Sequence, residues 1–372
     1  MAVKLHILFC TVFAVAFQAV AALVIPEGDV YNDPDYMIIS EAENGNQLSV
    51  GGTLNVNGLL VGNNSYFSEA EVEGEVNAGS VYVGGGSRGC KLLVKNGGVM
   101  RADSLRLYGD ATTGIPYSEL RNSISVTGSG SLLDISGHLN IWSPDAPGEV
   151  GQYGIPREIP AYLQVGSGAE VSVDTVSVEN GSWIAVREGG RFTVRSDLDV
   201  SEERMSLMIG STLTVEGHLR GLTSIEKGRR VNASSVLGNM NVRGLLSGTG
   251  TDHISVEGDL SISEDGTLEL SARETLHVSG DVQLGGVLTV LMDDDATVHE
   301  FGDRVQLFEI GGNVSGSFKR VDLISSGTSL QWDASELSAT GAVYAIPEPS
   351  TIALMGLAGA MLFSVRKHTA HH

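Results

Sequence analysis

Apolar and polar residues alternate in short stretches along most of this chain, and a glycine stands at one end of many stretches. Two examples are Gly210–Val215 and Gly286–Val290, in which Leu and Val fall on one side and Thr on the other. A period of two is typical of strands that bury one face. The pattern therefore predicts an all-β chain whose strands bury Leu, Val and Ile.

The strand-and-glycine units recur at a regular spacing. Neighbouring copies mostly lie about 20 to 24 residues apart, which is the length of one coil of a parallel β-solenoid. Stacked coils bury the apolar row that a single coil leaves exposed, so the repeat predicts a parallel β-solenoid, also called a β-helix. The alternative for the same strands is an antiparallel sandwich or barrel, with hairpins in place of the corners.

The pattern divides the body of the chain into three regions. We expect an N-terminal lead or cap over residues 23–50, solenoid repeats over 51–292 and a C-terminal β cap over 293–345. Caps are expected because a bare solenoid end exposes unpaired strand edges. Three segments interrupt the period and are expected to be irregular: 27–43, the proline-rich 143–160 and the basic 223–230.

Composition narrows the class of protein. The 372 residues include 48 glycines without a three-residue period, which excludes collagen, and the apolar fraction of 42% is too high for a disordered chain. The formal net charge of -22 makes nucleic acid and anionic membrane surfaces poor partners, because like charges repel.

The first 22 residues have the pattern of a secretory signal peptide. Lys4 precedes an uncharged apolar run that ends at Phe17, and small residues follow at Ala19, Ala21 and Ala22. An Ala-x-Ala site of this kind predicts cleavage after Ala21 or Ala22. Cys10 would be removed with this segment, so Cys90 would be the only cysteine left and no intramolecular disulfide is expected.

The segment 346–368 is unlike the rest of the chain. Pro347, Glu348 and Pro349 form a stiff polar tripeptide, because each proline fixes φ and restricts the residue before it. An uncharged apolar stretch of about fourteen residues follows, from Ile352 to Val365, which is shorter than the roughly twenty residues that span a bilayer comfortably. The stretch predicts a hydrophobic membrane helix.

A basic cluster follows this apolar stretch. Arg366 and Lys367 match a cytoplasmic stop under the positive-inside rule, and their long side chains can snorkel to the membrane surface. The alternative interpretation of the apolar stretch and basic cluster is an ordinary C-terminal membrane anchor that is never cleaved. The cluster is short, since His368 is followed by the uncharged tail Thr369–His372.

The order of Pro-Glu-Pro, one hydrophobic helix and a basic end resembles the PEP-CTERM sorting signal of envelope and biofilm proteins in Gram-negative-type bacteria. That family has an Arg-rich end, from which this chain departs. The resemblance implies that an exosortase, a membrane cysteine protease-transferase, recognises Pro347, Glu348 and Pro349 and acts at or near them. It implies an exported protein that passes through an inner-membrane intermediate to the cell surface, the outer envelope or the extracellular matrix.

The region 293–345 carries a second, looser resemblance. A Phe/Leu strand at Asp303–Ile310, the Gly316–Phe318 element and the Leu330–Asp333 element resemble the C-terminal cap of Gly-rich passenger-type solenoids of autotransporters. The resemblance implies a β cap after the solenoid repeats.

Motif matches for catalysis are weak. The segment Gly84–Gly89 matches both the G-x-S-x-G nucleophile elbow and the G-x-G-x-x-G loop, but each motif requires a following helix. Cys90–Val94 alternates like a strand, so a glycine-rich corner is the better interpretation. No catalytic residue or cofactor is assigned, and Trp142, Trp183 and Trp332 are too scattered to predict a sugar-stacking site.

Candidate metal ligands are also weak. His138 and His218 occupy matching positions in the repeat, and Asp259 and Asp281 fill the next two copies, which favours exposed corners over a metal site. The run 293–295 of three Asp residues would bind calcium weakly at most, because the glycine-rich calcium repeat is absent.

These observations predict a non-enzymatic structural or adhesive protein of the bacterial envelope or matrix. An exosortase and the membrane are its expected partners, with extracellular polysaccharide as a further one. The alternative is a secreted carbohydrate-active enzyme, either a polysaccharide lyase or a hydrolase, or a carbohydrate-binding protein on a β-helix scaffold. Fold analogy alone cannot supply a catalytic site.

Overall fold

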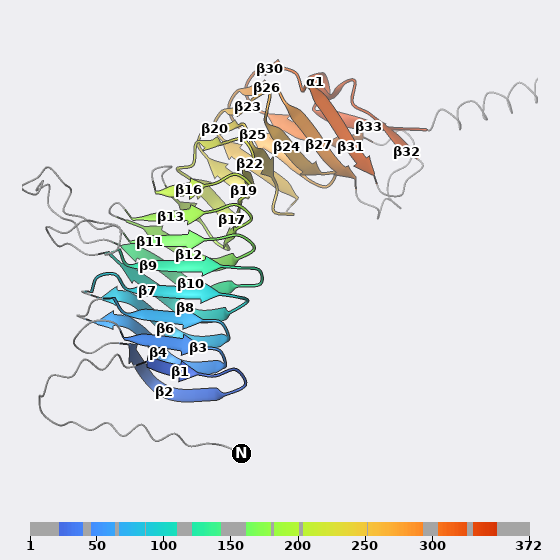
Figure 1. The fold of residues 1–372 in the computed structure, drawn as a ribbon. Helices are drawn as coiled ribbons and strands as arrows, with labels where there is room; N and C mark the ends of the chain where they lie inside the picture. The colour runs from blue at the N-terminus through green and yellow to red at the C-terminus, as the bar shows by residue number, and fades with distance from the viewer. Residues whose placement is uncertain are drawn as a thin grey trace, which may run out of the picture.

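The computed structural model describes residues 22–39, 46–63, 67–85, 87–109, 121–142, 161–179, 182–200, 204–250, 252–292, 304–325 and 330–347. Most strands within these ranges pair in parallel with their counterparts on the neighbouring coils (Figure 1). Gln47, Glu69 and Lys91, for example, are neighbours on successive coils and lie 22 residues apart. The predicted parallel β-solenoid is confirmed, and the antiparallel alternative is excluded for the coils.

One side of the first coils is built from short strands, which we call the first side sheet. Eight strands are stacked in it in chain order. They are β1 (Ala22–Ile25), β3 (Gln47–Val50), β5 (Glu69–Val72), β7 (Lys91–Lys95), β9 (Ser123–Thr127), β11 (Tyr162–Val165), β13 (Trp183–Val186) and β16 (Met205–Leu207).

The other sides of the coils are built from the main sheet. Its early strands are long and bend at a bulge, as β10 does between Ile135 and His138. They are β2 (Val30–Ile39), β4 (Thr53–Asn63), β6 (Glu75–Gly85), β8 (Val99–Tyr108), β10 (Leu132–Trp142), β12 (Glu170–Val178), β17 (Thr212–Arg220) and β19 (Arg230–Leu237).

Shorter strands complete the main sheet where a coil does not use one long strand. They are β14 (Arg191–Val194), β15 (Leu198–Asp199), β21 (Leu245–Ser247), β22 (His253–Glu257), β24 (Thr267–Ser271), β25 (Thr275–Val278), β27 (Val287–Met292), β29 (Phe308–Ile310) and β31 (Arg320–Ser325).

The later coils have their own short strands, which form the second side sheet: β18 (Ser224–Ile225), β20 (Met240–Val242), β23 (Leu260–Ile262), β26 (Val282–Leu284) and β30 (Val314–Gly316). The closing sheet is antiparallel and consists of β28 (Arg304–Gln306), β32 (Leu330–Asp333) and β33 (Ala342–Pro347). A single turn of helix, α1 (Leu337–Thr340), precedes β33.

The core is a set of apolar columns that run through the stack. Alternation points every second residue inward, and parallel pairing places inward residues of successive coils directly above one another. Burial of such rows is the main favourable term in folding. One column is fully buried and consists of Leu54, Val76, Met100, Leu133, Val171, Phe192, Leu213, Val231, Leu246, Leu268 and Leu288.

The stack of coils is bent in its second half (Figure 1). The first side sheet ends at β16 and the second side sheet begins at β18, and no pairing joins these two strands in the described residues. β18 is only two residues long. The interruption on this side allows the coils after β18 to tilt relative to those before β16.

Two segments expected to be irregular contain regular strands of the coils instead. Segment 27–43 contains β2, which pairs in parallel with β4, for example Tyr31 with Leu54. A polar run around Pro34 hides the alternation of β2 in the sequence. The strand tolerates this proline because β2 lies at the start of the stack and has a bulge between Asp33 and Tyr36. Segment 223–230 contains β18 and the turn into β19, with Ile225 buried. A single buried apolar residue does not give the alternating pattern from which a strand is predicted in the sequence.

The predicted boundary at residue 292 does not mark the end of parallel pairing. β27 pairs in parallel with β31, and β26 pairs with β30, so solenoid coils reach Ser325. Among the described strands, only those of the closing sheet have the antiparallel pairing of a separate cap. The predicted loop 143–160 lies outside the described residues.

Candidate functional site

The sorting segment is joined to the body through β33. The first half of β33, Ala342–Tyr344, pairs with β28, and its second half, Tyr344–Pro347, pairs with β32. Val343 and Ala345 are buried. The backbone N–H groups of Leu307 and Phe308 both donate to the Gly341 carbonyl, at 2.8 and 3.0 Å, and tie this sheet to the last coils. Pro347 is the last residue of β33, opposite Leu330.

The other predicted targeting residues are only partly described. Ala22 begins β1 and is exposed, whereas Ala19 and Ala21 lie outside the described residues. Glu348, Pro349, Arg366 and Lys367 also lie outside them, as does the predicted membrane helix. No helix in the described ranges has the length and apolar character needed to cross a bilayer.

The segment 84–89, which matches catalytic glycine motifs, has its described residues at the end of β6 and in the corner before β7. A strand, β7, follows it, so the requirement for a helix is not met. The buried Asn122 organises the corner: its Oδ1 accepts from the Cys90 N–H at 2.9 Å, and its Nδ2 donates to the carbonyls of Ser87 and Tyr108, both at 2.7 Å. Burial raises the pKa of the Cys90 thiol to about 11, so the thiol is protonated and unreactive at neutral pH.

The two histidines and two aspartates do not occupy equivalent corners, which corrects the interpretation of the repeat. His138 and His218 lie on β10 and β17 of the main sheet, each beside a strand bulge. Asp259 and Asp281 precede β23 and β26, at the entry to the second side sheet. The five-residue pattern fits both corners because each needs a glycine between two apolar residues.

Hydroxyl groups hold both histidines in place. His138 Nδ1 lies 2.8 Å from Thr175 Oγ1 and its Nε2 lies 3.0 Å from Ser177 Oγ, while His218 Nδ1 lies 2.9 Å from Ser235 Oγ. In the described part of the chain, no three His, Cys, Asp or Glu side chains are grouped so that they could hold a metal ion. The aspartate run 293–295 lies outside that part.

One cluster of carboxylates and a guanidinium lies on the main sheet. Arg195, which follows β14, donates from Nη2 to Asp134 on β10 and from Nη1 to Asp174 on β12, the latter at 2.9 Å. Hydrogen bonds to Asp134 and then Asp174 raise the pKa of Arg195. Because the guanidinium bridges the two carboxylates, the arrangement ties three successive coils together.

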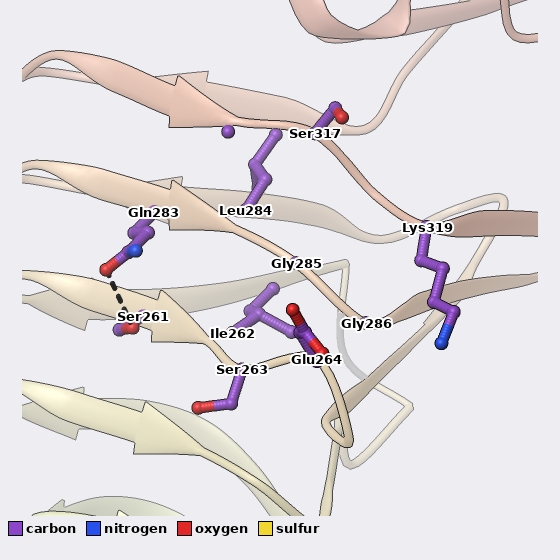
Figure 2. A pocket seen from close by; sticks show the side chains of 11 residues that line it. Ser261, Ile262, Ser263, Glu264, Gln283, Leu284, Gly285, Gly286, Ser317 and Lys319 are labelled. Carbon is purple, nitrogen blue, oxygen red and sulfur yellow. Dashed lines mark hydrogen bonds between the residues drawn. The ribbon is translucent and has the colours of Figure 1, made fainter.

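A polar groove runs along the second side sheet. One part has a volume of about 590 Å³ and another part of about 360 Å³, and they share Ser261 and Gln283. Figure 2 shows these two residues at one end of the larger part, Glu264 near its middle and Lys319 at the far end. Ser261 Oγ donates to Gln283 Oε1 at 3.4 Å. The groove presents hydroxyl, amide and carboxylate groups, which suit hydrogen bonding to a polar ligand.

Tryptophan side chains lie beside tyrosines and do not form one platform. Trp142 packs edge-on against Tyr108 on the neighbouring coil, with ring centroids 5.9 Å apart, and Trp183 packs against Tyr162 at 5.4 Å. For Trp332 only the backbone is described, within β32. Because the rings of each pair are perpendicular or tilted, the two rings do not form one flat platform.

Comparison with known families finds the PEP-CTERM protein-sorting motif at residues 345–367. The match covers all five residues predicted for sorting, Pro347, Glu348, Pro349, Arg366 and Lys367. No curated protein matches the chain. Exosortase recognises motifs of this class, so the chain is an exported protein that is sorted at a membrane through its C-terminal signal.

Sequence reasoning did not identify Asn122, the Arg195 cluster or the groove. The partners of Asn122 lie up to 38 residues away and those of Arg195 up to 61 residues away in the chain, so no local motif connects them. The groove residues Ser261 and Gln283 occupy outward strand positions, where any polar residue fits the alternation. Their register, which the structure supplies, is the missing information.

Proposed function

We propose that the exported chain is a non-enzymatic structural or adhesive element of the bacterial cell surface or extracellular matrix. One observation carries the proposal: the sorting motif begins within β33, the strand that closes a continuous stack of parallel coils. The signal thus delivers an elongated body whose surface consists of repeated rows of side chains. Such a body suits a stalk, a spacer or a polymer-binding rod.

The outward rows support a mechanical role. Asn32, Asn55 and Asn77 lie on successive coils, and the Nδ2 groups of Asn55 and Asn77 donate to the Oδ1 of the preceding asparagine, at 2.7 and 2.9 Å. The coils are therefore joined outside as well as inside. Repeat proteins of this kind gain stability from each neighbouring interface, so their length can be set by repeat number.

The enzyme alternative has one supporting observation, the pair of carboxylates at Asp134 and Asp174. A general acid needs a proton and a nucleophile needs freedom to attack, but both carboxylates are bonded to Arg195. The cluster also lies apart from the polar groove, which is on the second side sheet. We therefore favour a structural role for it, and expect no release of reducing or unsaturated sugar from a panel of polysaccharides.

The proposed location is tested by fractionation of a host that contains an exosortase. We expect the intact chain to yield a product in the cell-surface or matrix fraction. A variant that lacks Pro347, Glu348 and Pro349 should remain with the inner membrane, because its recognition sequence is gone. Recovery of the variant in the matrix at the level of the intact chain would contradict the proposed delivery.

A further inference from the structure

A basic hollow lies at a corner of the coils near the bend, and its charge is opposite to that of the whole chain. It has a volume of about 510 Å³, and its described lining holds four cations, Lys227, Arg229, Arg230 and Arg243, and the carboxylate of Asp265. Glu269 and Glu226, next to the hollow, pair with Arg230 and Arg243, so the cations still outnumber the carboxylates. The chain has a net charge of -22. A concentration of cations in so acidic a protein is a local feature that the overall composition does not explain.

The turns of successive coils place these cations together. Lys227 and Arg229 lie in the turn between β18 and β19, where Gly228 has a φ of 76° and the Arg229 N–H donates to the Glu226 carbonyl at 3.1 Å. Arg243 follows β20 on the next coil, and its N–H donates to the Ile225 carbonyl at 2.8 Å. The turn backbones are thus fixed, and the side chains project from neighbouring levels of one corner.

The four cations differ in how firmly they are paired. Arg230 is held by Glu269, with Nη2 2.6 Å from Oε1. Lys227 Nζ lies 3.3 Å from Asp265 and Arg243 Nη1 lies 3.4 Å from Glu226, and the side chains of these two pairs are exposed. Exposed pairs of this kind contribute little and exchange readily for another carboxylate. Arg229 Nε is buried and has no hydrogen-bond partner in the described part of the chain. A buried donor of this kind is costly unless a ligand or water satisfies it.

We propose that this basic hollow binds a carboxylated polysaccharide, a polymer of uronic acid residues, so that the solenoid adheres to an anionic matrix. The proposal rests on the function proposed above and names the chemistry of its polymer. A guanidinium matches a carboxylate through two parallel hydrogen bonds, and cations on successive coils can contact successive charges of one polymer strand. The polar groove does not compete for this ligand, because Asp259, Asp281 and Glu264 line it.

The test uses the full chain recovered after export, with polygalacturonate as the probe in affinity gel electrophoresis. The double variant Arg229→Gln with Arg243→Gln should bind polygalacturonate about ten-fold more weakly, because two charge-assisted contacts are lost. The matched control is Arg220→Gln on β17, an exposed arginine 4.0 Å from Asp199 and outside the hollow. It should change the affinity by less than about two-fold.

Three further measurements distinguish binding of the charged polymer from binding of a neutral polymer or of a single sugar. Neutral dextran should not bind, monomeric galacturonate should bind far more weakly than the polymer, and polygalacturonate binding should weaken strongly at about 0.5 M salt. Equal binding by the double variant and the unmodified chain would overturn the assignment, as would dextran binding of similar strength. If the chain reaches the matrix but does not bind polygalacturonate, this inference fails while the proposed function stands.

Discussion

The Oδ1 atom of Asp259 accepts a hydrogen bond of 2.8 Å from the backbone N–H of Asp281, its counterpart on the next coil. Asn239 Oδ1 accepts from the Asp259 N–H at 2.9 Å, and Asp281 Oδ1 accepts from the Asn313 N–H at 2.8 Å. A ladder of side-chain oxygens therefore runs along one corner of the solenoid. It gives a physical role to the Gly-Asp and Gly-Asn pairs of the repeat.

Replacement of Asp259 tests this ladder. Asp259→Ala removes the acceptor and should lower the free energy of unfolding by about 1–2 kcal/mol, because hydrogen bonds to charged groups contribute about 1.5–3 kcal/mol and this one is exposed to solvent. Asp259→Asn keeps the Oδ1 acceptor, as Asn239 shows, and should cost less than about 0.5 kcal/mol. Urea unfolding of both variants provides the comparison, and equal losses would rule out the ladder as the reason for aspartate here.

The glycine before each ladder residue is predicted to be essential for the close approach of coils. A Cβ at Gly280 would lie 2.3 Å from Asp259 Oδ1 and 2.6 Å from the Gly258 carbonyl oxygen. Gly280→Ala should therefore destabilise the chain by roughly 1–3 kcal/mol, as overpacking does. Gly85→Ala is the matched control, because the nearest atom to its Cβ would be 3.8 Å away and the substitution should be close to neutral. Similar unfolding midpoints for both variants would contradict the packing argument.

The solenoid was predictable from the sequence because its signal repeats. Buried apolar residues such as Leu213 and Val215 alternate with polar residues such as threonine, and the same pattern recurs in many copies of the repeat. Each copy therefore predicts the same buried face. The first and last coils were harder to predict. β2 carries a polar run at its bulge, and β30 has only three exposed residues, so neither shows clear alternation. Pairing with a regular neighbour, which sequence periodicity does not report, makes these segments part of the stack.

Arg195 is predicted to stabilise three coils at once. Arg195→Ala would leave Asp134 and Asp174 without their shared cation, and should lower the free energy of unfolding by roughly 1–2 kcal/mol. This range allows for solvent screening, because the Arg195 side chain is 35% exposed. Arg195→Lys keeps the charge but cannot form both hydrogen bonds with a planar fork, so an intermediate loss is expected. Thermal unfolding at low and high salt measures the loss of stability, which should be smaller in high salt. A loss that is independent of salt and equal in both variants would show that lost packing alone is the cause.

The buried thiol of Cys90 should make the free energy of unfolding depend on pH. Burial raises the pKa of its thiol from 9.0 to about 11 in the folded chain. The unfolded chain therefore releases the proton at lower pH, and the free energy of unfolding should fall as pH rises from about 9 to about 11. The difference between the two pKa values corresponds to at most roughly 3 kcal/mol. Urea unfolding across this range should give a steeper decline for the unmodified chain than for Cys90→Ala. Parallel declines would show that other groups cause the effect.

The sorting signal could be predicted from sequence because it is local. Pro347, Glu348 and Pro349 are adjacent, and the apolar stretch and basic end follow directly. The basic hollow could not be predicted in the same way. Segment 223–230 is visibly basic, but Arg243 joins it only through the stacking of coils, and the opposite charges nearby at Asp265 and Glu226 obscure the signal in any sequence window.

Mass spectrometry of the protein recovered from outside exosortase-containing cells is the most direct test of the central claim, that this solenoid is exported, sorted through its C-terminal signal and then freed of that signal. We predict a mature chain that begins after Ala21 or Ala22, ends at or near Pro349, and no longer contains Arg366 and Lys367. A surface-exposed protein that retains both basic residues would contradict processing at the signal.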